Sequence, residues 1–591
     1  MPPIPQDSNQ LLTKLEAAKN RFEARVPHPS RFLRRVGESA ANIAKLLTQL
    51  SKLQLTVPHQ LIRFHECLLF LRAFPHAPSQ ISRIENLLNT FHQRIEKLRA
   101  ASADMSVFDD FDTSGIAATT MQDTLSFDVA RWLVRRIPRN VEIAWDDYWD
   151  DDQSERTRGN TWPRFIPLLE EDADVEANIP WQSWLDAARG RQNPLPWLLN
   201  RFAQLPLPAR QQSELYDSLR LPLRWNLENL NLSRTRNWTR PRRFYFHQAP
   251  LIQRSEVSLE QELSKPAPKL EKLSAAAGKS VMHAIREIMI VRYRELYGTT
   301  LGDPRTVIRA DVGRGVVMHF WGLPPTRRLP LRAYVAGYTL KNGVPINYIE
   351  AIGLCEWIEV GFNTFYTYRQ GETAWIYAKA LRCLRALTNA TCISIYPYQI
   401  GQNNDEAIDS GAFWFYRKLG FRSGRPDLRK LCEREEERIA ANPRYRTPPR
   451  TLKRLAETHM FYELPPSTAA HSEPGAWDTF STRKLGPRIN RRMAQEFDGD
   501  SKRICRASTA AVTRALNINP AGWTPAQQQA LENWSLVLAF IPGLPQWATR
   551  EKQQLVTIIR AKSARNEMSY IRQTQHFPRL RAELLRLGSN R

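Results

Sequence analysis

The chain has 591 residues, of which 42% are hydrophobic, and it contains 17 tryptophans. This length exceeds that of one compact core, so three or four domains or subdomains are expected, and the apolar content excludes wholesale disorder. A formal net charge of +24 favours contact with polyanions such as nucleic acid, anionic lipid or nucleotide-like ligands. A generally arginine-rich proteome explains the same charge without any such partner.

The cysteines and the apolar segments limit the cellular compartment in which the protein is expected. No two cysteines have CxxC spacing, so the sequence predicts neither a metal site nor a disulfide framework, and reduced thiols are expected. The N-terminus has no basic-then-apolar leader, which argues against secretion. The longest apolar run, residues 536–544, is too short to span a bilayer and contains Pro542. We therefore expect a soluble, cytoplasmic protein without membrane insertion.

The N-terminal half is predicted to be mainly helical. Leucine-rich stretches broken by prolines predict a helical bundle over residues 1–100. Residues 101–122 are rich in Ser, Asp and Thr, which is typical of a linker or a mobile loop. Residues 123–270 are predicted to form a mostly helical region rich in Trp and Pro.

Two stretches of this half carry opposite charges. Residues 145–152 (WDDYWDDD), joined by the acidic residues 170–172, suit either a patch that binds a cation or a basic partner, or a solvated loop that folds against the chain's own arginines. Residues 233–247 interleave arginine with aromatic residues, a composition that grips phosphates and stacks bases. The same composition suits a surface strand held by cation–π contacts, so both interpretations stay open.

Residues 271–465 are predicted to form a central α+β domain. A helix is expected over residues 271–297, one or two strands over 306–322, and a hairpin over 332–354 whose Asn342–Gly343 pair supplies the positive φ angles of a tight turn. The alternating segment 356–366 predicts the next strand. Apolar residues recur at helical spacing from Ala374 onward, which makes residues 367–373 a strand-to-helix loop. Such a loop directs free backbone N–H groups and the helix dipole at one spot, which favours a phosphate.

The end of this domain carries its most specific motif. Residues 392–396 predict a short strand, and Ile408, Ala412, Phe415 and Leu419 predict a helix that Gly420 closes. The run AFWFYRKLGF, residues 412–421, resembles the last helix of GNAT acyltransferases, N-x-x-A-x-x-F-Y-x-K-L-G-F. The order of hairpin, strand, glycine-bearing loop, helix, strand and short helix resembles the catalytic half of that family, over about a sixth of the chain.

The resemblance implies an α+β fold: a central GNAT-like mixed β-sheet with helices, flanked by mainly α-helical N- and C-terminal regions. It also implies that two neighbouring strands splay apart and leave a slot for the thioester arm of coenzyme A. Tyr416 would then lie beside the sulfur and protonate the departing thiolate. The alternative interpretation of Tyr416 is a core aromatic.

The resemblance places the family's pyrophosphate cradle, Q/R-x-x-G-x-G/A, at residues 369–374. Arg369 and Ala374 fit this register, but Glu372 stands where glycine is expected, and the register that puts Gly371 there leaves residues 368 and 373 as mismatches. A carboxylate at this point repels a pyrophosphate, and a side chain blocks close approach of the backbone. Asp409 likewise stands where the family has asparagine. The residues that the resemblance assigns to an acyl-CoA co-substrate are Phe365, Tyr366, Thr367, Arg369, Gln370, Gly371, Glu372, Thr373, Ala374 and Asp409.

If acyl-CoA binds in this way, an acceptor amine loses a proton and attacks the thioester carbonyl, and strand N–H groups hold the oxyanion. The base is expected on or near the strand that precedes the loop. Glu359 is the first candidate, Glu356 the second, and Glu350 on the neighbouring strand a third. Each is equally explained as an exposed strand carboxylate. No metal is implied.

The C-terminal part continues the helical pattern. A charged helix over residues 427–442 and a closing strand over 458–464 are predicted, followed by a Pro/Ser/Gly-rich linker over 466–486. Residues 487–591 are predicted to be a basic helical region in which Thr524 begins a helix with a capping box. These basic helices suit a polyanion-binding surface or ordinary solvated helix faces.

Three functions remain open. The first is an acyl-CoA-dependent N-acyltransferase that acts on an amine of unknown identity. The second is a non-catalytic GNAT-like protein whose basic flanks bind nucleic acid or a protein partner. The third is a GNAT-like protein that takes an aminoacyl group from tRNA and needs less of the pyrophosphate loop.

Overall fold

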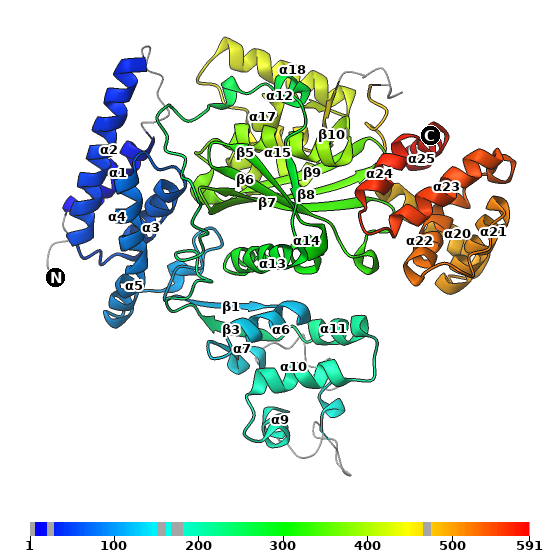
Figure 1. Cartoon of the computed structure of the whole chain (residues 1–591), viewed down its shortest axis with the longest axis horizontal. Helices are drawn as coiled ribbons and strands as arrows, with labels where there is room; N and C mark the ends of the chain where they lie inside the picture. Colours follow the sequence, from blue (N-terminus) through cyan, green and yellow to red (C-terminus); the bar gives the residue numbers. More distant parts are fainter. Residues whose placement is uncertain (1–5, 21–28, 150–160, 167–180, 465–473, 590–591) are drawn as a thin grey trace. The chain divides into compact units, whose positions relative to one another are not determined.

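The structure is a computed structural model that describes residues 6–20, 29–149, 161–166, 181–464 and 474–589 (Figure 1). It divides into two compact units. Unit 1 comprises Met1–Arg21, Pro27–Arg240 and His283–Thr300, and unit 2 comprises Phe22–Val26, Pro241–Met282 and Leu301–Arg591. The predicted combination of helices with a mixed β-sheet is confirmed.

Unit 1 consists of N-terminal helices followed by a small α+β region. Its described elements are α1 (Gln6–Asn20), α2 (Pro29–Lys52), α3 (Pro58–Ala73), α4 (Pro78–Asn89), α5 (Phe91–Ala100), η2 (Ser106–Phe108), β1 (Thr120–Thr124), α6 (Phe127–Arg136), β2 (Val141–Ile143), α7 (Trp145–Trp149), η4 (Trp162–Arg164), α9 (Trp181–Arg189), α10 (Pro194–Gln204), α11 (Ala209–Ser218) and β3 (Pro222–Asn226). Strand β3 pairs antiparallel with both β1 and β2. Helices α6 and α10 bury aromatic and aliphatic side chains in the same core as the inward side chains of these strands.

The predicted linker over residues 101–122 is part of this unit and not a connection between domains. Ile116 and Ala117 are fully buried, and β1 begins at Thr120. The three-stranded sheet also adds strands to a region predicted to be mostly helical. Its strands have three to five residues, too few to show a clear alternation in sequence.

Unit 2 is built on a nine-stranded sheet with the order β11-β12-β10-β9-β8-β7-β6-β5-β4. All described neighbours pair antiparallel except β9 and β10, which are parallel. The strands are β4 (Leu270–Lys272), β5 (Ile308–Gly313), β6 (Val316–Trp321), β7 (Ala333–Lys341), β8 (Val344–Leu354), β9 (Trp357–Thr364), β10 (Cys392–Ile395), β11 (Arg422–Ser423) and β12 (Met460–Glu463).

The central hairpin and the helix that follows it lie where the sequence predicts them. Asn342 and Gly343 have φ angles of 48° and 78°, as a tight turn between β7 and β8 requires. Helix α15 (Thr373–Thr388) follows β9 and packs on the sheet face that carries Phe362, whose ring centroid lies 5.0 Å from that of Tyr377. The helix predicted from Ile408 to Leu419 is instead two helices, α16 (Asp405–Asp409) and α17 (Ala412–Arg417). Gly411 separates them with a φ of 69°, a left-handed conformation that a continuous helix does not allow.

The remaining elements of unit 2 are helical. They are η5 (Arg254–Glu256), α12 (Leu259–Ser264), α13 (Ala275–Ile290), which begins in unit 2 and ends in unit 1, α14 (Tyr297–Leu301), which belongs to unit 1 up to Thr300, η6 (Pro304–Thr306), η7 (Pro325–Arg327), η8 (Tyr366–Tyr368), η9 (Pro397–Ile400), α18 (Pro426–Ala441), α19 (Pro449–Leu455), α20 (Thr482–Phe497), α21 (Ser501–Leu516), α22 (Pro525–Leu538), η10 (Leu544–Gln546), α23 (Thr549–Lys562), α24 (Met568–Gln575) and α25 (Pro578–Gly588). The predicted capping box at Thr524 is present.

The C-terminal helices pack against the central sheet in the same unit and do not form a separate domain. Trp477 stacks on Trp357 at the start of β9, with ring centroids 5.3 Å apart, and Phe480 contacts both rings. Residues 466–473 of the predicted linker lie outside the described residues. None of the helices described is long and apolar enough to cross a lipid bilayer.

Candidate functional site

The parallel strands β9 and β10 pair over only a short length. Their pairs are Trp357 with Cys392, Ile358 with Ile393 and Glu359 with Ser394. Strand β10 ends at Ile395, while β9 continues to Thr364 and pairs with β8 throughout. Beyond Glu359 the backbone groups on the β10 side of β9 therefore face no strand in the described part of the chain. We call this place, where β9 and β10 cease to pair, the fork.

Glu359 stands at the fork and contacts a histidine. Its Oε2 lies 2.8 Å from Nε2 of His459, the residue just before β12, and its Oε1 accepts a 3.5 Å bond from Arg332. The Tyr396 ring lies edge-on to the His459 ring, with centroids 5.4 Å apart. Glu359 and His459 retain 16% and 24% of their side-chain exposure. The pair is therefore partly open to solvent.

The charges around Glu359 keep it ionised. Burial raises the pKa of this carboxyl, but the hydrogen bond and charge of His459, with the charge of Arg332, outweigh burial and leave the pKa below its ordinary value. A carboxylate that accepts a bond from an imidazole fixes the orientation of the ring and stabilises its protonated form. When His459 is in its neutral form, the pair can take up a proton from a group that reaches the imidazole.

The third candidate base, Glu350, lies on the same sheet face as Glu359. Glu350 pairs with Gly361, two residues after Glu359 on β9, and paired residues share a face. The Tyr334 hydroxyl donates to the Glu350 carboxyl. Burial raises the pKa of Glu350, and the Tyr334 bond opposes that rise only in part. The two carboxyls thus have pKa values displaced in opposite directions.

Glu356, the second candidate base, is engaged in packing. Its Oε1 accepts bonds of 2.7 Å from both Trp477 Nε1 and Arg581 Nε, and the residue is only 6% exposed. These bonds hold the C-terminal helices against the start of β9. Glu356 immediately precedes β9, at the end of the strand opposite the fork.

Tyr416 lies in an aromatic cluster on the α15 face of the sheet, opposite the face of Glu359. Its ring contacts those of Tyr377 and Phe421, with centroids 5.6 and 5.7 Å away. Burial raises the pKa of the Tyr416 phenol above its ordinary value, so it holds its proton at neutral pH. The structure does not bring Tyr416 and Glu359 into contact.

Glu372, the residue that departs from the family loop, is turned into the protein. It immediately precedes α15, is fully buried, and pairs with Arg314 and with Lys341, whose Nζ lies 3.4 Å from Oε2. The backbone N–H of Ile252 donates to Oε1 at 3.2 Å. Burial lowers the pKa of Lys341 to about 8 against the opposing charge of Glu372. We call Glu372, Lys341 and Arg314 the buried charge cluster.

The other predicted loop residues differ widely in exposure. Phe365, Thr367 and Ala374 are buried; Gly371 and Thr373 are half-buried, and Gln370 and Asp409 are exposed. Arg369 pairs with Glu406 and lies over the ring of Tyr366. Tyr366 and Tyr398 follow the carboxyl ends of β9 and β10 and are 54% and 53% exposed. Ligands commonly bind near the carboxyl ends of parallel strands, so these two rings flank a favourable position.

One polar side chain points across the fork without a full set of partners. A Cβ at Gly361 would lie 2.6 Å from Nε2 of Gln399, so the Gln399 amide packs directly on β9. Its Oε1 is buried and accepts no hydrogen bond from the described residues. A buried oxygen that accepts no hydrogen bond lowers the stability of the folded protein, and an N–H group of a ligand can satisfy it.

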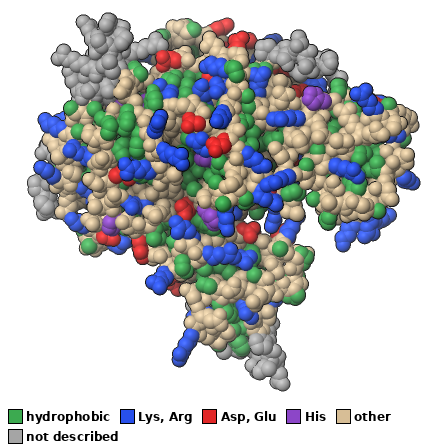
Figure 2. Space-filling model, in the orientation of Figure 1, with side chains coloured by type: hydrophobic (Ala, Val, Ile, Leu, Met, Phe, Trp, Pro, Cys, Tyr) green, Lys and Arg blue, Asp and Glu red, His purple; other side chains and the backbone are tan. Residues whose placement is uncertain are grey.

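The two charged stretches of the N-terminal half are in part engaged with the chain itself, while Arg240, Arg242 and Arg243 of the basic stretch are exposed. Arg234 and Thr235 are buried, and Arg234 pairs with Glu66 while the Thr235 hydroxyl lies 2.9 Å from His65 Nε2. Asp147 pairs with Arg224 at 3.0 Å. Residues 150–152 and 170–172 of the predicted acidic patch lie outside the described residues. Figure 2 shows that Lys and Arg side chains are spread over the visible face.

Sequence reasoning named Glu359 as a candidate base, which stays a prediction, and did not single out His459, Arg332, Tyr396 or Gln399. A usable signal existed for His459. The closing strand runs antiparallel to β10, so its first residue must lie at the carboxyl end of β10, next to Glu359.

Comparisons with protein-family models, curated proteins and solved structures find no match for the chain. No group of three or more potential metal ligands comes together among the residues that the structure describes.

Proposed function

We propose that the chain is a GNAT-type N-acyltransferase that moves an acyl group from coenzyme A to an amine, with Glu359 and His459 as its proton acceptor. The fork is the observation that carries this proposal. The resemblance of residues 412–421 to GNAT proteins implies two strands that splay to admit a thioester arm, and β9 and β10 are a parallel pair that stops pairing at Glu359. The closing strand β12 on the far side of β10 supports the same reading.

The chemistry follows from the groups at the fork. His459 takes a proton from the acceptor amine, and Glu359 stabilises the resulting imidazolium. The amine nitrogen bonds to the acyl carbon while the carbon–sulfur bond breaks. N–H groups of β9 beyond Glu359, on the side where β10 no longer pairs, stabilise the oxyanion, and Tyr416 gives its proton to the departing thiolate. The unpaired Gln399 oxygen accepts an amide N–H of the donor arm.

The buried charge cluster affects the charge that the loop before α15 presents to the pyrophosphate of acyl-CoA. Because the Glu372 carboxylate is fully buried against Arg314 and Lys341, it does not present a bare negative charge to a pyrophosphate. Two cations against one carboxylate leave the cluster with an excess of positive charge. The departure from the family's glycine therefore changes the shape of the loop more than its charge.

Substitution of Glu359 tests the proposal. Glu359→Gln keeps the size of the side chain and removes its charge, so turnover is expected to fall about 100- to 10,000-fold with acyl-CoA affinity unchanged. The matched control is Glu457→Gln, which removes an exposed carboxylate paired with Arg425. Isothermal titration of the full chain with acetyl-CoA measures the affinity. Absence of acetyl-CoA binding to the unmodified chain contradicts the proposal.

A second function is favoured by one observation. The backbone N–H of Ile252 bonds to Glu372, so the segment before η5 lies against the start of α15, where the family binds pyrophosphate. A donor such as aminoacyl-tRNA, which needs less of that loop, avoids this obstacle. Salt-dependent RNA binding, together with no effect of acetyl-CoA on thermal stability, would favour this donor over acyl-CoA.

A further inference from the structure

A basic pocket lies at the far end of α15 from the fork. The end of α12, the C-terminal half of α15 and the end of α24 border an open cavity of about 470 Å³. Lys265, Arg382, Arg385, Arg572 and His576 line it, and none of its lining residues is acidic. The rise of 1.5 Å per residue places Arg385 about 18 Å along the helix axis from Thr373. We call this cavity the α15 C-terminal pocket.

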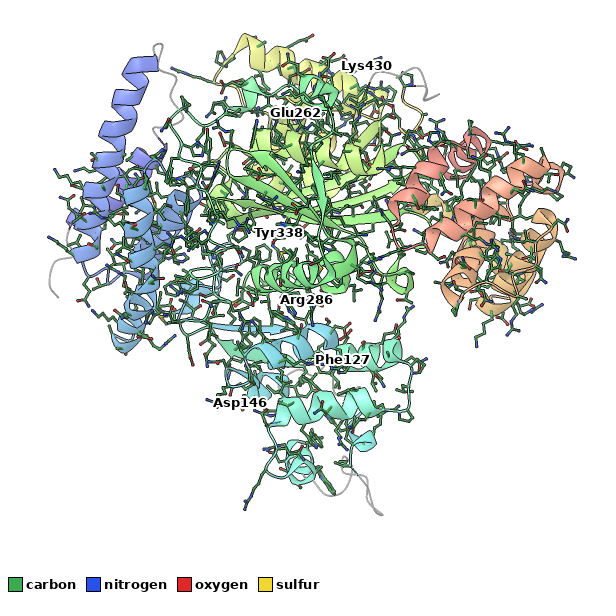
Figure 3. All side chains as sticks on the ribbon, in the orientation of Figure 1. Phe127, Asp146, Glu262, Arg286, Tyr338 and Lys430 are labelled. Atoms are coloured by element: carbon green, nitrogen blue, oxygen red, sulfur yellow. The ribbon has the colours of Figure 1, made fainter. Side chains whose placement is uncertain are left out.

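One carboxylate near the pocket balances only part of the charge. Glu262 on α12, labelled in Figure 3, accepts 2.8 Å bonds from Lys265, Lys379 and Arg382. Burial raises the pKa of Glu262, but these cations outweigh burial and hold the pKa below its ordinary value. Three cations therefore share a single negative charge. Arg382 Nε is also buried without a hydrogen-bond acceptor among the described residues.

Two further guanidinium groups have no acidic partner among the described residues. Arg385 donates to the backbone oxygen of Leu263, and Arg572 donates to those of Ala386 and Leu387 at 3.0 and 2.8 Å. These bonds fix the positions of both groups but leave their charges uncompensated. Guanidinium groups that are held in place and keep free N–H donors are well suited to phosphate oxygens.

We propose that the α15 C-terminal pocket binds the phosphate groups of a polyphosphate or phosphate-ester ligand. Its volume lies within the range of small-molecule sites, about 300–1,000 Å³. No aromatic side chain lines it except the imidazole of His576, so the ligand is recognised through its phosphates and not by stacking of a base. This inference does not depend on the acyltransferase activity, because the pocket and the fork share no residue.

The test uses inorganic pyrophosphate and the full chain. Isothermal titration is expected to show saturable binding at one site per chain. Arg385→Gln is expected to weaken that binding about tenfold or more, since a charge-assisted bond contributes about 1.5–3 kcal/mol. The matched control is Arg434→Gln, which removes an exposed arginine from the outer helix α18 and is expected to leave binding unchanged.

A second variant guards against misfolding of the first. Lys265 is 53% exposed, so Lys265→Gln disturbs packing little, and about threefold or greater weakening is expected. The proposal is overturned if the unmodified chain shows no saturable pyrophosphate binding, or if folded Arg385→Gln and Lys265→Gln both bind as tightly as Arg434→Gln.

A competition experiment identifies the source of the phosphates. Two results together would assign the pocket to a nucleic-acid backbone. Pyrophosphate would displace a single-stranded oligonucleotide from the unmodified chain, and the oligonucleotide would bind Arg385→Gln only weakly. Pyrophosphate binding that the oligonucleotide does not affect assigns it to a small phosphorylated ligand. Either result supports a phosphate site.

Discussion

Removal of the Glu372 carboxylate is expected to destabilise the centre of unit 2. In Glu372→Ala, Lys341 stays fully buried and loses its counter-ion. Its pKa is already about 8, so releasing its proton at pH 7 costs about 1 kcal/mol. The N–H of Ile252 also loses its acceptor, which costs about 1–3 kcal/mol. The expected loss is therefore about 2–4 kcal/mol.

Hydrogen exchange with mass spectrometry measures this loss locally, which matters because a chain of two units need not unfold in one step. Amides of β7, β8 and α15 are expected to exchange roughly thirtyfold to a thousandfold faster in Glu372→Ala. The control is Glu406→Ala, which removes a half-exposed partner of Arg369.

A double variant isolates the pairing from the loss of a side chain. Lys341→Met combined with Glu372→Gln replaces both charges, so it is expected to cost less than the sum of the two single changes. Exchange in Glu372→Ala equal to that in Glu406→Ala, or strict additivity in the double variant, would refute the argument that burial of Lys341 requires Glu372.

Three further predictions concern single residues. Tyr416→Phe should depress turnover far more than acyl-CoA affinity, and equal turnover would remove the phenol from the acid role. Glu356→Gln should lower the free energy of unfolding by about 1–3 kcal/mol because it weakens the bonds to Trp477 and Arg581, and turnover per folded molecule should stay unchanged. Loss of turnover without loss of stability would instead identify Glu356 as the base. Burial raises the pKa of Glu350 above its ordinary value of 4.5, so just above pH 4.5 the folded state binds more protons than the unfolded state. The free energy of unfolding therefore falls as the pH rises from 4.5 through the pKa of the folded state. Glu350→Gln should therefore gain stability relative to the unmodified chain between pH 4 and 7 in urea unfolding, and a constant difference would contradict this.

The sequence predicts those parts of the fold that depend on local geometry. The Asn342–Gly343 turn and the change from strand to helix period at Ala374 are encoded within a few residues, and both are present. The split between α16 and α17 was missed because the stripe of apolar residues continues across Gly411, although the backbone there is left-handed. The short strands of unit 1 were missed because three to five residues show little periodicity.

The candidate site was predictable only where its residues belong to one segment. Glu359 follows from its position on the strand before the loop, and His459 needed the pairing of β12 with β10. The burial of Glu372 depends on Lys341 and Arg314, which lie 31 and 58 residues away in sequence. A mismatch with a family motif therefore shows that the local sequence differs from the motif. It does not show whether the carboxylate of Glu372 faces a ligand or the core.

The two ends of α15 explain where this unit can hold an anion. The helix dipole places about half a positive charge at the N-terminus and half a negative charge at the C-terminus, so the dipole alone favours an anion near Thr373. That end already holds the Glu372 carboxylate with its two cations. At the other end, Arg385 and Arg572 bring two full charges without acidic partners among the described residues, which outweigh the half charge of the dipole. A phosphate is therefore held more strongly at the C-terminal end of α15 than the dipole predicts, and neutralising Arg385 should weaken phosphate binding there.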